Sequence, residues 1–325
     1  MRLRHWRVAA ALLLIGATLA ALVGVVPAGA ETLLNVATPA IAFSFVPVNI
    51  GIEKGFFQKH GIAVNLITFR GGSPMMQAAT AGSVDIVVGS GSDFVYLRKG
   101  VPLTAVAQAA GPPNLFGVVV WNDSGIKTVE DLKGTKMGIS TVGSMTEWLA
   151  LDLARWKGWP PGSIDPVAIG SDQAGQVAAL KLHQVASVMG TSAFGLQLEE
   201  QHDGRLLIQV SDYLGDIVIH MVEATNTIAA KNPDAVRGFL AGWFDTIRFM
   251  RENKAETVAL ARGETGFDQT VEDREYDLTM PMFSTDGHFR PEGLRSLLSL
   301  LSRHGAIPAD TDLTKFYTDR FLPPG

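Results

Sequence analysis

Three serines stand where a strand is expected to end and a helix to begin. Ser73 precedes a proline, Ser90 stands three residues before an aspartate, and Ser144 stands three residues before a glutamate. Each pattern is typical of a helix N-cap, whose side-chain oxygen accepts a hydrogen bond from a free backbone N–H. Helix N-termini also present unpaired N–H groups and a partial positive charge, which suit an anion. The serines could therefore bind an anionic or polar solute, although capping alone also explains them.

Charged residues and glycines occur near these serines in the sequence or in the other predicted pocket loops. Arg70 is the cation of a predicted pocket loop, where it could pair with a carboxylate or sulfonate or lie solvated at the rim. Asp172 could meet an amine of a ligand, whereas Asp85 is expected to hold a turn. Gly72 and Gly143 lack a side chain, so a ligand could approach their backbone closely.

The elements that position these residues occur twice, and the second copy begins about a hundred residues after the first. Candidate strands at 33–37, 63–69 and 84–88 correspond to candidate strands at 136–139, 166–169 and 187–189. Ligands of parallel α/β sheets bind beyond the carboxyl ends of the strands. The repeat therefore predicts an α/β fold with two lobes. Each lobe would be a mostly parallel sheet flanked by helices, with a ligand cleft between the lobes.

The chain is expected to cross between the lobes twice. We assign residues 31–120 and 217–325 to lobe 1 and residues 121–216 to lobe 2. The crossings near 116–122 and 216–223 should form the hinge. Amphipathic helices, such as the one predicted at 235–252, are expected to pack on lobe 1.

Composition limits the classes of function. Of the 325 residues, 47% are hydrophobic and 18% are charged, which is typical of a globular chain. The net charge of −5 and the lack of a basic stripe argue against nucleic-acid binding. The sequence has no cysteine, so disulfides and a thiol nucleophile are excluded. The histidines form no metal-spaced cluster, and no nucleophile elbow, Walker loop or dinucleotide fingerprint occurs. We therefore expect no metal, cofactor or catalytic residue.

The N-terminal residues are typical of a secretory signal peptide. Three arginines lie among the first seven residues, residues 8–26 are apolar, and residues 28–30 read Ala-Gly-Ala. We expect a signal peptide at 1–30, cleavage before Glu31 and a periplasmic location. The alternative is retention as an anchor, since the apolar run is long enough to span a bilayer.

Five stretches carry a resemblance to a known family. They lie at 46–64, 71–85, 124–134, 143–153 and 286–305, and include Glu53-Lys54-Gly55-Phe56 and Asp131-Leu132-Lys133-Gly134. In this order they resemble the periplasmic solute-binding proteins of ABC importers, in the class that binds nitrate, sulfonates, taurine and thiamine precursors. The resemblance implies a type II periplasmic binding protein fold. It also implies a small-molecule ligand and an ABC permease in the inner membrane as partner.

The resemblance also points to site residues, because residues 43–45 match the segment that lines the family's pocket. The candidate ligand-binding residues are Thr38, Ser44, Phe45, Arg70, Gly72, Ser73, Ser90, Ser92, Thr141, Gly143, Ser144, Thr146, Asp172 and Thr191. One departure is Ala186, which stands where the first copy has Asp85. We expect a monomer that is not an enzyme and that holds a small organic anion or polar solute of the sulfonate, nitrate or taurine kind.

Two alternatives stay open at this point. The first is a pyrimidine-precursor binding protein, or a synthase-like enzyme of the same fold. The cysteine-rich motif of the eukaryotic pyrimidine synthases is absent, which argues against the enzyme. The second is a ligand-sensing module for a membrane receptor.

Overall fold

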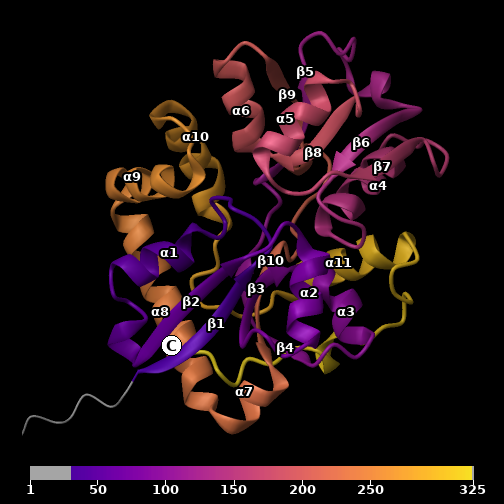
Figure 1. Ribbon diagram of the computed structural model, residues 1–325. Helices are drawn as coiled ribbons and strands as arrows, with labels where there is room; N and C mark the ends of the chain where they lie inside the picture. Colours follow the sequence, from indigo (N-terminus) through magenta and orange to yellow (C-terminus); the bar gives the residue numbers. More distant parts are fainter. Residues whose placement is uncertain (1–30, 324–325) are drawn as a thin grey trace, which may run out of the picture. The chain divides into compact units, whose positions relative to one another are not determined.

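The structure is a computed structural model, and it describes residues 31–323 (Figure 1). The expected signal peptide at 1–30 lies outside the described residues. Within the described range, no helix is both long enough and apolar enough to cross a membrane.

The first sheet contains five strands in the order β2-β1-β3-β10-β4. They are β1 (Thr32–Thr38), β2 (Ile62–Thr68), β3 (Ile86–Ser90), β4 (Leu103–Ala110) and β10 (His220–Thr225). β1 pairs in parallel with β2 and β3, whereas β10 runs antiparallel to both β3 and β4. Four strands therefore share one direction and the reversed strand lies between two of them.

The second sheet repeats this arrangement, with the order β7-β6-β8-β5-β9. Its strands are β5 (Phe116–Trp121), β6 (Thr135–Ile139), β7 (Ile164–Ala168), β8 (Ser187–Thr191) and β9 (Gly204–Gln209). Here β5 is the reversed strand, antiparallel to β8 and β9. The internal repeat and the two-lobed α/β fold are thus confirmed. Each sheet is mixed, because its one reversed strand lies between three parallel strands on one side and a single edge strand on the other.

The placement of β5 corrects the expected division of the chain. Residues 116–120 were assigned to lobe 1, but β5 pairs only with strands of the second sheet. The chain crosses between the sheets at 111–115 and at 213–219, so the first crossing lies before the segment expected to form the hinge. An apolar strand that directly follows a crossing could belong to either lobe, and only its pairing decides which.

Helices cover both sheets (Figure 1). They are α1 (Val46–Glu53), α2 (Gly72–Thr80), α3 (Phe94–Arg98), α4 (Met145–Trp156), α5 (Gln173–Lys181), α6 (Ser192–Glu200), α7 (Asn226–Lys231), α8 (Pro233–Glu252), α9 (Lys254–Thr265), α10 (Gln269–Thr279) and α11 (Pro291–Arg303). The amphipathic helix predicted at 235–252 is confirmed as α8. Its buried face, including Phe239 and Trp243, packs in the core that contains Val36 of β1 and Val88 of β3.

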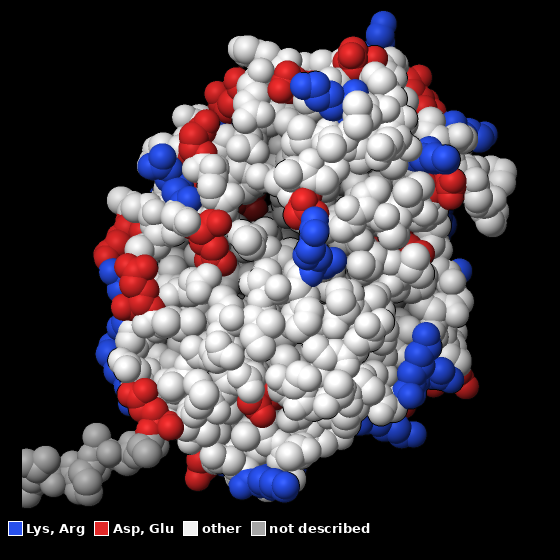
Figure 2. All heavy atoms as spheres, in the orientation of Figure 1, with Lys and Arg blue, Asp and Glu red and all other residues white. Residues whose placement is uncertain are grey.

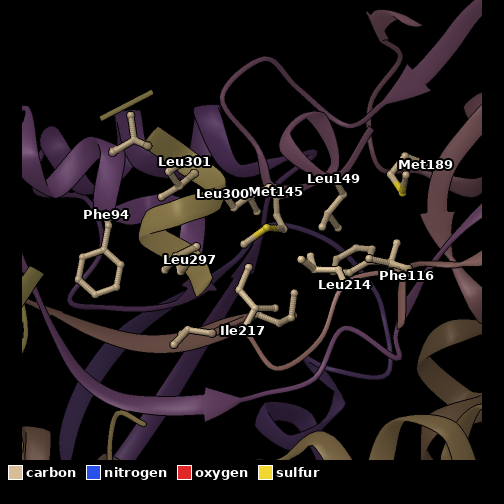
Figure 3. Packing of buried hydrophobic residues seen from close by; sticks show 14 of the residues in the cluster. Phe94, Phe116, Met145, Leu149, Met189, Leu214, Ile217, Leu297, Leu300 and Leu301 are labelled. Carbon is tan, nitrogen blue, oxygen red and sulfur yellow. The ribbon is translucent and has the colours of Figure 1, made fainter. Parts of the chain in front are cut away.

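The helices near the C-terminus also contact the second lobe, which the sequence did not predict. Phe267, just before α10, and Val271 in α10 pack with Ala193 and Leu196 of α6. A second contact is shown in Figure 3, where the leucines of α11 lie close to Met145 of α4. The two lobes therefore share buried apolar contacts on two sides of the crossings.

A buried pair of carboxyl groups lies inside the first lobe. Asp93 and Glu223 are both almost completely buried. A Cβ atom at Gly89 would lie 2.2 Å from Asp93 Oδ2 and 2.5 Å from Glu223 Oε2, so glycine makes room for the pair. Burial raises the pKa of Asp93 from 3.8 to about 7. Burial, with the neighbouring charge of Asp93, raises the pKa of Glu223 well above its ordinary value.

These carboxyl groups predict how stability depends on pH. The pKa of Asp93 is higher in the folded chain than the ordinary 3.8, so the folded state binds more protons between about pH 4 and pH 7. The free energy of unfolding should therefore fall as the pH rises through this window. The double variant Asp93→Asn/Glu223→Gln, with two neutral isosteres, should show a shallower fall in urea denaturation at pH 5 and pH 8.

The matched control is Asp310→Asn, which replaces an exposed aspartate and should keep the wild-type dependence. A double variant that loses as much stability between the two pH values as the wild type would contradict this account of the pair.

Candidate ligand-binding site

A cavity of about 480 Å³ lies where the loops that follow the strands of the two sheets meet. Figure 2 shows that the surface is hollowed between the part that carries α5 and α6 and the part that carries α1 and α2. Its lining comes from loops at 39–45, 68–72, 140–146 and 171–173, from the starts of β5 and β10, and from 264–267. The ends of β3 and β8, the start of α6 and single residues of α2 and α5 complete it. This volume is in the range of cavities that hold small molecules.

Much of the cavity wall is apolar. Five phenylalanines line it, namely Phe45, Phe69, Phe116, Phe194 and Phe267, together with Met75, Met145 and Met189. These side chains come from both lobes and from the segment between α9 and α10. The wall can therefore bury the apolar part of a solute on several sides at once.

At the start of α4, the polar part of the cavity lining consists of hydroxyl groups. Ser140 Oγ lies 3.0 Å from both Ser144 Oγ and Thr146 Oγ1, and the latter two oxygens are 2.8 Å apart. Ser144 is the N-cap residue of α4, but its side chain makes no capping hydrogen bond. The expected capping box is therefore wrong in this detail, because Ser144 bonds its neighbouring hydroxyls. Glu147 instead accepts a hydrogen bond from Gly143 N at 2.6 Å.

The expected N-cap at Ser73 is also corrected. The helix α2 begins at Gly72 with Gly71 as its N-cap, so Ser73 lies inside the first turn. Its hydroxyl donates to the Val142 carbonyl oxygen at 2.6 Å and thus joins the first lobe to the second. The pattern of Ser90 and Asp93 is confirmed as a capping box.

Several contacts close the mouth of the cavity. Arg70 pairs with Asp172 across the lobes, and the Ser171 hydroxyl donates to the Pro39 carbonyl oxygen at 3.1 Å. Hydrogen bonding to Arg70 lowers the pKa of Asp172, which also caps α5 by accepting from Gly175 N at 2.9 Å. Arg70 and Asp172, the two charged candidates, therefore form an ion pair with each other, and the lobes are in contact at the mouth of the cavity.

Gly71 allows this close approach of the lobes. Its φ of +123° is one that side chains rarely adopt, and a Cβ atom there would lie 2.5 Å from Thr141 Cγ2. Any larger residue at this position would push the loop after β2 away from the loop after β6.

His220 lines the cavity where β10 begins. The residue is 3% exposed and its Nδ1 lies 3.0 Å from the Gly89 carbonyl oxygen. The rings of Phe45 and Phe116 stand 4.8 Å and 6.3 Å from it, centroid to centroid. Burial lowers the pKa of His220 from 6.5 to about 4, so the imidazole is neutral at pH 7.

The structure divides the predicted site residues into two groups. Those that line the cavity are Phe45, Arg70, Gly72, Ser90, Ser144, Thr146, Asp172 and Thr191. The remaining candidates, Thr38, Ser44, Ser73, Ser92, Thr141 and Gly143, lie outside that lining. Of these, Ser73, Thr141 and Gly143 lie at or beside the contact between the lobes, and Thr38, Ser44 and Ser92 are buried. A role in ligand contact stays a prediction for every one of them.

Three residues of the lining, His220, Glu264 and Phe267, are not among the predicted site residues. His220 lies in the segment that was read only as a crossing, where a single imidazole among apolar residues was the available signal. Glu264 and Phe267 come from the junction of α9 and α10. Their approach to the cavity depends on tertiary packing, and no local pattern indicates it.

The chain has relatives among known proteins. Residues 42–257 match the model of the protein family described as NMT1/THI5 like. A relative from Brucella abortus (strain 2308), which has the provisional name of a binding protein, is 29% identical over 216 residues. The match covers 64% of this chain and 64% of that relative, so the chain spans slightly less than two thirds of its length.

Two solved structures share the fold of nearly the whole chain. A protein of Bordetella bronchiseptica RB50 has a TM-score of 0.77 at 24% identity, with 90% of this chain and 96% of that chain covered. The alkanesulfonate-binding protein SsuA from Xanthomonas axonopodis pv. citri, bound to MOPS, has a TM-score of 0.75 at 16% identity. The alignment covers 89% of this chain and 99% of that one. These similarities confirm the expected fold class.

The contact across the cavity mouth can be measured with a double-mutant cycle on Arg70→Ala and Asp172→Asn. Asparagine keeps the cap of α5 and removes the charge. Because exposed ion pairs are weak, the coupling free energy from urea denaturation should be about 0.2–1 kcal/mol. The matched cycle pairs Asp172→Asn with Arg98→Ala, an exposed arginine of α3, and should give no coupling. Zero coupling between Arg70 and Asp172 would mean that this ion pair does not stabilise the contact between the lobes.

Proposed function

We propose that this chain, which belongs to the NMT1/THI5-like family, is the substrate-binding component of an ABC importer. It captures a small solute in the periplasm and delivers it to a permease in the inner membrane. The observation that carries the proposal is the cavity enclosed between two lobes of repeated topology, with lining from both. The signal-peptide-like N-terminus and the resemblance to importer binding proteins support the location and the partner.

Capture requires the lobes to separate and close, and the crossings provide the hinge. Arg290 braces both crossings: its Nη2 donates to Asp216 Oδ1 at 2.9 Å in the second. Its backbone N–H donates to Gln108 Oε1 at 3.0 Å, close to the start of the first. Rotation about these short segments would break the contacts of Arg70 and Ser73 across the mouth and open the cavity to solvent.

The cavity can bind a solute that has an apolar body and a polar head. The proposed ligand is a small organic anion or polar solute, of the sulfonate, nitrate or taurine kind. The phenylalanines and methionines would cover its body, and the hydroxyls at the start of α4 would bond its head. Hydrogen bonds contribute about 0.5–1.5 kcal/mol each, or roughly 1.5–3 kcal/mol when one partner is charged. Together with apolar burial, two or three of them reach the roughly 8 kcal/mol of micromolar affinity.

We propose binding and delivery by a monomer, with no reaction catalysed. The sequence supports this through the missing cysteine-rich motif of the pyrimidine synthases. A sensor role would use the same cleft and closure, and would differ in the membrane protein that the closed form contacts.

The proposal predicts which hydroxyls matter for affinity. A thermal-shift screen of alkanesulfonates, taurine, nitrate and neutral carboxamides identifies a solute, since a ligand of the folded state raises the melting temperature. Ser144→Ala should then lower the affinity for that solute about tenfold, as measured by calorimetry. This is the effect of losing one hydrogen bond of about 1.4 kcal/mol. The change in stability should be below about 1 kcal/mol, because the Ser144 side chain does not cap α4.

Ser83→Ala is the control, since it removes an exposed hydroxyl that lies outside the cavity lining and away from the contact between the lobes. It should change the affinity by less than Ser144→Ala does. An unchanged affinity for Ser144→Ala would exclude the start of α4 as the binding point for the ligand's polar head. If no solute of the screen raises the melting temperature, the proposed function loses its main support.

A further inference from the structure

The tautomer of His220 follows from its contact with the backbone. A carbonyl oxygen only accepts hydrogen bonds, so the Nδ1 atom that lies 3.0 Å from the Gly89 oxygen must carry the proton. The ring is neutral at pH 7, because burial lowers the pKa of His220 to about 4. The lone pair of the neutral ring is therefore on Nε2, and this atom can only accept a hydrogen bond.

Nε2 has no hydrogen-bond partner among residues 31–323, although it is buried. Buried polar atoms in folded proteins are nearly always paired, and an unpaired one calls for an explanation. The ring lines the cavity and lies near the rings of Phe45 and Phe116. A donor on a bound solute would supply the missing partner at this place.

The charged residues of the cavity lining favour a neutral solute that donates a hydrogen bond. Arg70 is the basic side chain of the lining, and it is paired with Asp172. The third charged residue is Glu264, whose Oε2 has no partner within the described part of the chain. Burial raises the pKa of Glu264, so this group also resists ionisation. An anion in the cavity would find no free counter-charge there, whereas a neutral solute needs none.

We propose that His220 is a ligand-binding residue that accepts a hydrogen bond from the solute. The solute is accordingly a neutral molecule with an N–H or O–H donor beside an apolar body, such as an amide or an amino-substituted ring. This inference rests on the proposed function and narrows its ligand class, because it selects the polar neutral solute over the organic anion. Phe45 and Phe116 hold the apolar part of the molecule next to the donor.

A matched pair of probes tests the charge of the ligand. Benzenesulfonamide and benzenesulfonate have nearly the same shape, but the first is neutral with N–H donors and the second is an anion without donors. Calorimetry at pH 7 should show the sulfonamide binding at least about tenfold more tightly, as one hydrogen bond predicts. Benzamide and benzoate form a second pair with the same expected order.

His220→Phe tests the residue itself, since phenylalanine keeps a ring near Phe45 and Phe116 and removes the acceptor. The variant should lower the affinity for benzenesulfonamide about tenfold and should change the affinity for benzenesulfonate little. His60→Phe, at a histidine outside the cavity, is the control and should leave both affinities unchanged. If His220→Phe fails to fold, the ¹⁵N resonance of Nε2 in labelled wild-type protein decides. It should be that of an unprotonated nitrogen, and it should move when benzenesulfonamide is added.

Three results would overturn the inference. They are a protonated Nε2 in the free protein, an anion that binds at least as tightly as its neutral partner, and the failure of every neutral donor to bind. An anion that binds and raises the melting temperature would leave the proposed function in place while removing this inference.

Discussion

The two reversed strands, β5 and β10, determine both the lobes and the cavity. Each enters the interior of a sheet directly after a crossing and pairs on both of its edges, so neither can slide without breaking two ladders. Their first residues are Phe116 and His220, whose rings stand 6.3 Å apart in the cavity lining. The pairing of the reversed strands therefore fixes where the crossings between the sheets end and which rings line the cavity.

Much of the fold could be predicted from the sequence because its signals are local and occur twice. The strand pattern of β1, β2 and β3 recurs in β6, β7 and β8, and helix periodicity identified α8. The lobe of β5 could not be predicted, because an apolar strand after a crossing could pair within either sheet. The contact of Phe267 with α6 joins segments far apart in the chain, and no local pattern indicates it.

The site was predicted best where loops follow strands. Phe45, Ser90, Ser144 and Thr191 line the cavity because the carboxyl ends of the strands in both lobes face it. Ser73 has the same sequence signal, yet its hydroxyl donates a hydrogen bond to the Val142 carbonyl oxygen of the other lobe. Arg70 and Asp172 were read as separate ligand contacts and instead pair with each other. Both differences arise from tertiary contacts between the lobes, which a pattern of residue types does not indicate.

Closure of the lobes on a solute is what the proposed capture requires of the mouth contacts and the braced crossings. Small-angle X-ray scattering of residues 31–325, with and without a saturating solute confirmed by calorimetry, measures it. If the lobes close on the solute, the solute-free form samples open arrangements, and its radius of gyration should be larger than that of the bound form. Identical scattering profiles for the solute-free and the solute-bound protein would contradict capture by hinge closure.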